Sequence, residues 1–166
     1  MKIIIGATGA IAALLVLMDC HAAMSAPATS HPLPGAEIRR NFIHGNNRII
    51  LIYSVERLND ADRLHKMMGT GSWYVPKTAI RNFQITFDKK QVNIPLSAIS
   101  DIYDPNEIRI DFRKGHYCVD VIGGDGAESF ETRIWFDSRH VFARESGDIG
   151  FVAPSERSSY RLIEGP

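Results

Sequence analysis

Apolar and polar residues alternate along most of the chain beyond residue 47. A period of two is typical of strands that bury one face, because successive side chains of a strand point to opposite sides of the sheet. Clusters of turn-forming residues separate the alternating runs. The pattern predicts strands at 48–55, 80–88, 91–95, 107–113, 116–122, 129–137, 139–144 and 159–163.

One segment departs from this alternation. From Asp60 to Met68 the apolar residues return at the spacing of a helix face. Asn59 is a suitable N-cap for such a helix and Gly69 a suitable stop. The sequence therefore predicts one short helix between the first two strands.

Side-chain pairing predicts the register of the first central hairpin. A two-residue turn at Lys114 and Gly115 places apolar residues opposite one another along one face. These pairs are Phe112 with Tyr117, Ile110 with Val119, and Ile108 with Val121. The other face then pairs Arg109 with Asp120, so both faces favour the same register.

The next hairpin contains a second glycine-rich segment, "GGDGAESF". A phosphate cradle would need a helix N-terminus after it, whereas a strand pattern follows, so we interpret the segment as a hairpin loop. A four-residue loop from Asp125 to Glu128 pairs Asp120 with Arg133, while a tighter turn would set Asp120 against Glu131 and oppose like charges. The longer loop also gives the apolar pairs Val121 with Thr132, Val119 with Ile134, and Tyr117 with Phe136.

An earlier hairpin, turning at Lys89 and Lys90, would pair Phe87 with Val92 and Ile85 with Ile94. Together these elements predict a mainly β fold. We expect an antiparallel meander of about eight strands with one short helix, forming a small barrel or a sandwich.

The N-terminal 25 residues have the order of a secretory signal peptide: Lys2, an apolar run from Ile3 to Met18, and the small residues of "HAAMSA". An uncleaved anchor is the alternative. A dinucleotide-binding interpretation of Gly6 and Gly9 fails, because the residues that follow are apolar on every face and no pattern of a parallel sheet appears. Asp19 before Cys20 departs from the pattern of a lipidated cysteine.

These features predict an exported protein, periplasmic or secreted, with no membrane span after signal cleavage. We divide the chain into a signal peptide at 1–25, a flexible leader at 26–46 and a single antiparallel domain at 47–166. Basic and acidic residues number 19 each, and their signs alternate along the chain. A nucleic-acid-binding protein would instead concentrate basic residues, so we expect no nucleic-acid partner.

The predicted register leaves one face of the central strands polar. Its cross-strand rows are Arg113, His116 and Asp137; Asp111, Cys118 and Trp135; and Arg109, Asp120 and Arg133. Most such faces are only solvated, with weak ion pairs. Trp and Arg also dominate binding hot spots, so we predict a binding surface of Trp135, Arg133, Arg109, Asp120 and Arg113, extended by Trp73 and Tyr74.

An enzymatic alternative would use Cys118 as the nucleophile, His116 as the base and Asp137 to orient it. Residues two apart on a strand lie about 6.6 Å from one another, beyond the reach of short side chains, which disfavours this arrangement. The histidines show no metal-ligand spacing, and the acidic residues of "SDIYDPNE" depart from a calcium loop, so we expect neither a metal nor a cofactor.

The sequence thus favours an exported, non-catalytic domain that binds a protein or a small molecule. An inhibitor or immunity-type role is one version of this prediction. Two alternatives stay open: a small cysteine-dependent hydrolase or transferase, and a barrel that holds an apolar small molecule.

Overall fold

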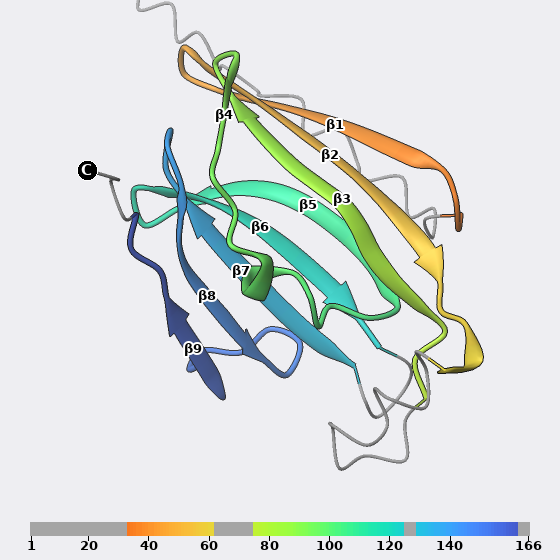
Figure 1. The fold of residues 1–166 in the computed structure, drawn as a ribbon. Coiled ribbons are helices and arrows are strands. Elements are labelled where there is room, and N and C mark those ends of the chain that lie inside the picture. The colour runs from red at the N-terminus through yellow and green to blue at the C-terminus, as the bar shows by residue number, and fades with distance from the viewer. Residues whose placement is uncertain (1–32, 62–74, 125–128, 163–166) are drawn as a thin grey trace, which may run out of the picture.

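A computed structural model describes residues 33–61, 75–124 and 129–162. Its strands form two antiparallel sheets, in the orders β1-β2-β3-β4 and β5-β6-β7-β8-β9, which face each other as a sandwich and do not close into a barrel (Figure 1). The elements are β1 (Glu37–His44), β2 (Asn47–Arg57), β3 (Thr78–Phe87), β4 (Lys90–Gln91), the 3₁₀ turn η1 (Leu96–Ala98), β5 (Pro105–Arg113), β6 (His116–Gly123), β7 (Phe130–Phe136), β8 (Val141–Gly147) and β9 (Glu156–Ser159). The predicted mainly antiparallel fold is confirmed, and of its two versions the sandwich is correct.

The core fills the space between the two sheets. Inward-facing side chains of β2 and β3 meet those of β6 and β7, and both contributions are fully buried where the sheets overlap. The largest of these fully buried side chains are Tyr53, Phe136, Ile49, Leu51, Ile85 and Ile134. No helix among the described residues is long and apolar enough to cross a membrane.

The registers predicted for the central hairpins are confirmed. Arg109 pairs with Asp120 across β5 and β6, and Asp120 pairs with Arg133 across β6 and β7. Lys114 and Gly115 form the turn between β5 and β6, both with positive φ (52° and 80°), as expected for a two-residue hairpin turn. The loop residues 125–128 themselves lie outside the described residues.

The register predicted between β3 and β4 is wrong by two residues. Phe87 pairs with Lys90 and not with Val92, because the turn is made by Asp88 and Lys89, whose φ angles are 44° and 72°. Asp88 Oδ1 accepts a hydrogen bond from the backbone N–H of Arg48 at 2.7 Å, which holds the aspartate in this turn. β4 itself spans only Lys90–Gln91.

Two other boundaries differ from the sequence-based expectation. β1 lies within the range 26–46 assigned to a flexible leader, and it pairs along its whole length with β2. β9 ends at Ser159, so it precedes the predicted strand at 159–163. The predicted helix begins at Asp60 and Ala61, and the rest of it, like the predicted signal peptide, falls outside the described residues.

A short connection after β4 joins the two sheets through backbone hydrogen bonds. Val92 N–H donates to Ile85 O of the first sheet at 2.9 Å. One residue later, Asn93 N–H donates to Arg139 O at 2.8 Å, and Asn93 O accepts from Val141 N–H of β8 at 2.9 Å. Backbone hydrogen bonds therefore connect the two sheets on this side. β1 and β5 are edge strands of their sheets.

Candidate functional site

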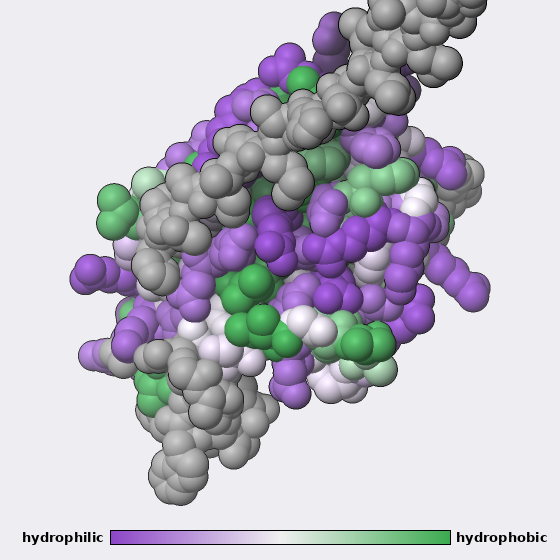
Figure 2. Space-filling model, turned by 180° about the vertical axis from the view of Figure 1, so that it is seen from behind, coloured by the Kyte–Doolittle hydropathy of each residue, from purple (hydrophilic) through white to green (hydrophobic). Residues whose placement is uncertain are grey.

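The outer face of the β5–β9 sheet carries a network of arginines and carboxylates. Strand periodicity directs Ile108 and Ile110 into the core, and thereby directs Arg109 and Arg113 outward. Asp120 of β6 and Arg133 of β7 point to the same face because they are paired with Arg109 and with each other. Seen from behind, the molecule is mainly hydrophilic, and a smaller group of hydrophobic residues lies in the lower half of the view (Figure 2).

Asp120 lies at the centre of this network, and its side chain is fully buried. Its Oδ2 accepts from Arg113 Nη2 at 2.5 Å and from Arg109 Nε at 3.4 Å. Its Oδ1 lies 4.0 Å from Arg133 Nε and has no hydrogen-bond partner. Three guanidinium groups thus surround one carboxylate, which we call the Asp120 cluster.

Burial raises the pKa of Asp120, and the nearby Arg113 and Arg109 only partly oppose that effect. The ionised carboxylate is therefore less favourable in the folded protein than in the unfolded chain. The guanidinium groups remain charged, and 44% of the Arg109 side chain and 31% of the Arg113 side chain are exposed. Asp120 consequently fixes two solvent-accessible arginines without adding much to stability.

We expect Asp120→Asn to leave the free energy of unfolding at neutral pH unchanged or to raise it by up to about 1 kcal/mol. The raised pKa means that ionisation costs stability at neutral pH, and that this cost disappears as the pH falls through the folded-state pKa. The wild type should therefore gain on the variant as urea titrations move to acidic pH. A loss above about 2 kcal/mol in the variant at neutral pH would contradict this reasoning.

A second carboxylate, Glu131, holds the connection between β8 and β9 against the same face. Its Oε1 accepts from Arg133 Nε at 2.8 Å, and its Oε2 accepts from the backbone N–H of Gly150 at 2.7 Å. Burial would raise the pKa of Glu131, but these hydrogen bonds outweigh it and lower that pKa. Arg133 also stacks over the Phe151 ring, with Cζ 4.0 Å from the centroid.

Sequence reasoning missed this loop contact. Glu131 and Arg133 are two residues apart on one strand, so their shared face was a usable signal. The position of Gly150 and Phe151 was not, because no periodic pattern fixes how a loop folds back. As a result, only 16% of the Arg133 side chain is exposed, and Arg109 and Arg113 form the accessible part of the cluster.

Trp135 occupies the predicted face but is not exposed there. Its relative exposure is 7%, and it packs with Cys118, Ala143 and Phe142. Its indole N–H donates to Glu145 Oε2 at 3.0 Å, which satisfies its polar group. The structure therefore makes Trp135 a part of the packing beneath the network, and Trp73 and Tyr74 lie outside the described residues.

The enzymatic arrangement of Cys118, His116 and Asp137 does not assemble. Cys118 is fully buried, and burial together with Asp120 raises the pKa of its thiol to about 12. No hydrogen bond joins these three residues, all of which the structure describes. A protonated, inaccessible thiol is a poor nucleophile, so the geometry disfavours catalysis by Cys118.

Asp137 has a different set of partners. Its Oδ1 accepts from the backbone N–H groups of Arg139 and His140, at 2.7 and 2.9 Å. It also lies 3.3 Å from His140 Nδ1, while the His116 ring packs edge-on against Phe142 with centroids 5.2 Å apart. Asp137 thus stabilises the turn between β7 and β8 and does not orient His116.

We expect the Cys118 thiol of the folded protein to react with iodoacetamide at least about a hundredfold more slowly than in the urea-unfolded chain at mildly alkaline pH. Its pKa of about 12 leaves almost no thiolate there, and its burial excludes the reagent. Mass spectrometry of the peptide containing Cys118 separates its labelling from that of Cys20. Equal labelling rates in the two states would restore Cys118 as a candidate nucleophile.

Two open grooves formed by described residues bear on the apolar-ligand alternative. One has a volume of about 630 Å³ and is lined by Leu33, Pro34, Gly35, Glu56 and Arg57. The other is smaller. It has a volume of about 400 Å³ and is lined by Phe83, Gln91, Val92, Asn93 and Ile94. It lies along the connection between the sheets and borders the core at Phe83 and Val92. Among the described residues, no group of three or more His, Cys, Asp or Glu side chains is placed to hold a metal ion.

Comparison of the chain with protein-family models, with curated proteins and with solved structures finds no match.

Proposed function

We propose that this protein is an exported, non-catalytic binding module that holds a protein partner against the outer face of the β5–β9 sheet. Arg109 and Arg113 make the principal contacts. The main support for this proposal is that the buried Asp120 anchors both guanidinium groups while much of each arginine side chain stays accessible to solvent.

Anchored arginines suit binding for an entropic reason. A free arginine side chain loses about 0.5–1.5 kcal/mol of conformational freedom when a partner immobilises it. Asp120 holds Arg109 and Arg113, and Asp111 Oδ2 also accepts from Arg113 Nε at 2.7 Å. Much of that cost is met during folding. Arg109 Nη1 also lies 3.5 Å from Glu107 Oε1, and the guanidinium N–H groups outside these contacts can engage carboxylates or carbonyl groups of a partner.

The chemistry of the partner follows from this arrangement. A surface presenting two oriented guanidinium edges favours a protein segment with accessible carboxylates, since arginine binds carboxylates in a bidentate manner. An inhibitor or immunity-type protein is one form of such a module, because it needs a rigid face and an export signal but no reactive group. The inaccessible thiol of Cys118 favours this proposal over a cysteine-dependent enzyme.

The test is affinity capture from the exported proteins of the source cells, with stoichiometry measured by mass spectrometry. We expect the wild type to retain one protein at near-equal amounts and the Arg109→Ser, Arg113→Ser variant to lose it, with affinity reduced at least about a hundredfold. The double variant leaves the buried Asp120 carboxyl without its two hydrogen-bond donors, so thermal unfolding must establish that the variant is folded before its binding is compared.

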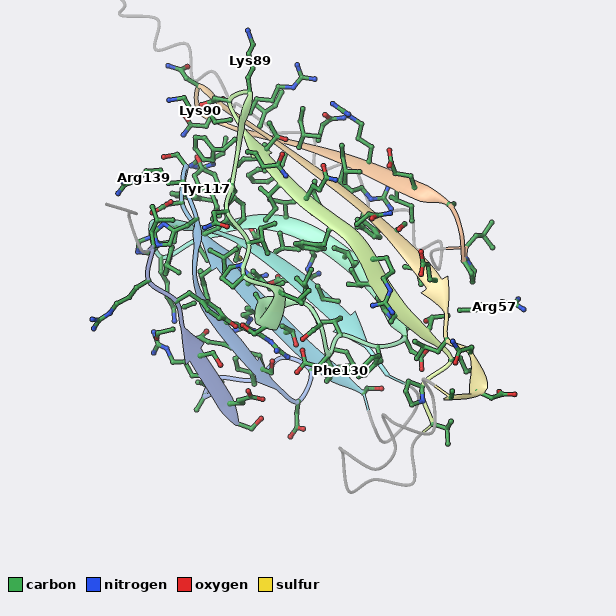
Figure 3. All side chains as sticks on the ribbon, viewed as in Figure 1. Arg57, Lys89, Lys90, Tyr117, Phe130 and Arg139 are labelled. Carbon is green, nitrogen blue, oxygen red and sulfur yellow. The ribbon has the colours of Figure 1, made fainter. Side chains whose placement is uncertain are left out.

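Arg57→Ser, Lys90→Ser is the matched control, since it also removes two positive charges. Arg57 and Lys90 belong to β2 and β4 of the other sheet, and their side chains project away from the body of the molecule (Figure 3). This control should retain the partner. Loss of the same protein in both variants would indicate nonspecific charge attraction, and equal retention by all three chains would exclude the Asp120 cluster as the binding surface.

A further inference from the structure

β5 is an edge strand in which apolar and charged residues alternate from Glu107 to Arg113. β5 is the first strand of its sheet, and its residues 107–113 pair only with β6 in the described part of the chain. An open edge presents unpaired backbone N–H and C=O groups, to which another strand can add. Pro105 and the bulge beside it protect the start of β5, and the His44 ring of β1 stacks on Phe112 near its end, with centroids 4.0 Å apart. Between these two points, no described strand pairs with the outer edge of β5.

The turn at Lys114 and Gly115 determines which backbone groups face outward. The residues flanking a two-residue hairpin turn form a hydrogen-bonded pair, here Arg113 and His116, and such pairs alternate along the ladder. The outward backbone groups therefore belong to Ile108, Ile110 and Phe112. Consistent with this, the Phe112 N–H donates sideways to Asp111 Oδ1 at 2.7 Å and not to β6.

In β5, charged residues at equal distances on the two sides of Ile110 have opposite signs. The strand reads Glu107, Ile108, Arg109, Ile110, Asp111, Phe112, Arg113, so charged residues alternate in sign at every second position. If two copies of β5 pair antiparallel with Ile110 opposite itself, Arg109 faces Asp111 of the second copy, and Glu107 faces Arg113 of the second copy. Each of these opposite-charge pairs occurs twice by symmetry.

The same pairing also satisfies the backbone and the apolar face. Ile108 meets Phe112 of the second copy and Ile110 meets itself, so all the pairs that must exchange hydrogen bonds have outward groups on both strands. Ile110 and Phe112 are only partly buried in the single chain, although they pack against the core. A second β5 would cover their remaining exposed surface.

Neighbouring registers are disfavoured. A shift of two residues in one direction sets Asp111 against itself and Arg109 against Arg113. A shift of two in the other direction sets Arg109 against itself and Glu107 against Asp111. Cross-strand pairs of like charge destabilise a sheet, and a shift of one residue would misalign the outward backbone groups.

We propose that the protein forms a two-fold dimer by antiparallel pairing of β5 with β5 of a second copy, centred on Ile110. The two β5–β9 sheets become one continuous sheet, and Asp111 exchanges its contact with the Phe112 N–H for Arg109 of the second copy. This edge adjoins the proposed partner surface and shares Arg109 and Arg113 with it, since both arginines take part in the cross-strand charge pairs. The dimer brings these side chains of both copies onto one face.

The test is sedimentation equilibrium of the purified chain from about 1 µM to about 1 mM, with Ile110→Pro as the principal variant. The Ile110 N–H faces outward, so proline removes an edge donor without breaking the ladder to β6. We expect the wild type to dimerise and Ile110→Pro to weaken dimerisation at least tenfold. Asp111→Lys, which opposes Arg109 of the second copy with a like charge, should weaken it by a similar factor.

Asn41→Pro is the matched control, because the Asn41 N–H faces outward from β1, the free edge of the other sheet. It should dimerise as the wild type does, and thermal unfolding should show that all variants are folded. A wild type that remains monomeric throughout would overturn the proposal, as would a dimer that Ile110→Pro leaves intact or that Asn41→Pro disrupts instead. Ile110→Pro retains Arg109 and Arg113, so its effect is separable from loss of the proposed partner.

Discussion

Phe136→Ala is expected to lower the free energy of unfolding by about 3–5 kcal/mol. Phe136 is completely buried between the two sheets, and its ring lies 5.9 Å from that of Tyr117 in the adjoining strand. Removing the ring forfeits its transfer free energy and leaves a cavity, which neighbours drawn from both sheets can fill only in part.

Urea titration monitored by circular dichroism measures this change, and Val152→Ala serves as its control. Val152 is fully exposed, so its truncation should alter the free energy of unfolding by less than about 0.5 kcal/mol. A loss below about 1 kcal/mol for Phe136→Ala would mean that the two sheets do not share the packed interior described above.

Gly123→Ala is expected to cost about 1–3 kcal/mol, an unusually large effect for the addition of one methyl group. A Cβ at Gly123 would lie 2.8 Å from the backbone O of Tyr103 and 2.5 Å from Cζ of Phe130. The Phe130 ring can rotate away, but the Tyr103 carbonyl belongs to the chain entering β5 and cannot move without disturbing that strand.

Gly147→Ala provides the comparison, since it makes the same chemical change on another strand. Its Cβ would meet only side-chain atoms of Phe151, at 3.1 Å or more, and these can shift by a few tenths of an ångström. Differential scanning calorimetry should give a clearly larger decrease in melting temperature for Gly123→Ala. Equal decreases would mean that the contact with the Tyr103 carbonyl does not limit the space at position 123.

The sequence predicted the register of β5, β6 and β7 because two independent patterns constrain it. Apolar pairs determine which side chains face inward, and charge pairs on the outer face then select the pairing of Arg109 with Asp120 and of Asp120 with Arg133. A shift of one residue exchanges the two faces of a strand, and the tighter turn at Asp125 and Gly126 opposes like charges across the strands. Only one arrangement satisfies both patterns.

The hairpin between β3 and β4 lacked the second constraint. A shift of two residues leaves every side chain on its original face, so alternation alone does not distinguish pairing of Phe87 with Lys90 from pairing with Val92. The deciding features were the positive φ angles of Asp88 and Lys89 and the hydrogen bond to Arg48, which is remote in sequence. β1 was missed for a different reason: Arg40 lies between Ile38 and Phe42 on one face of the strand and interrupts the apolar alternation.

The candidate site was predicted in its composition but not in its exposure. Cross-strand pairing brought Arg109, Arg133 and Asp120 together correctly, and the position of Arg113 two residues beyond Asp111 followed from the strand period. Burial of Trp135 results from its packing with Cys118, Ala143 and Phe142, which pairing rules do not describe. The disfavoured enzymatic alternative would have Asp137 orient His116, whereas in the structure Asp137 accepts hydrogen bonds from the backbone of its own turn.

The connection through Val92 and Asn93 has a consequence for how the protein opens. Consecutive residues donate to the two different sheets, so separating the sheets must break either the bond from Val92 to Ile85 or the bonds that join Asn93 to Arg139 and Val141. Two sheets held only by side-chain packing could fluctuate as separate units, each with its own opening free energy. Here the backbone itself couples them, so amide hydrogens in the centres of both sheets should exchange with solvent only when the whole sandwich unfolds.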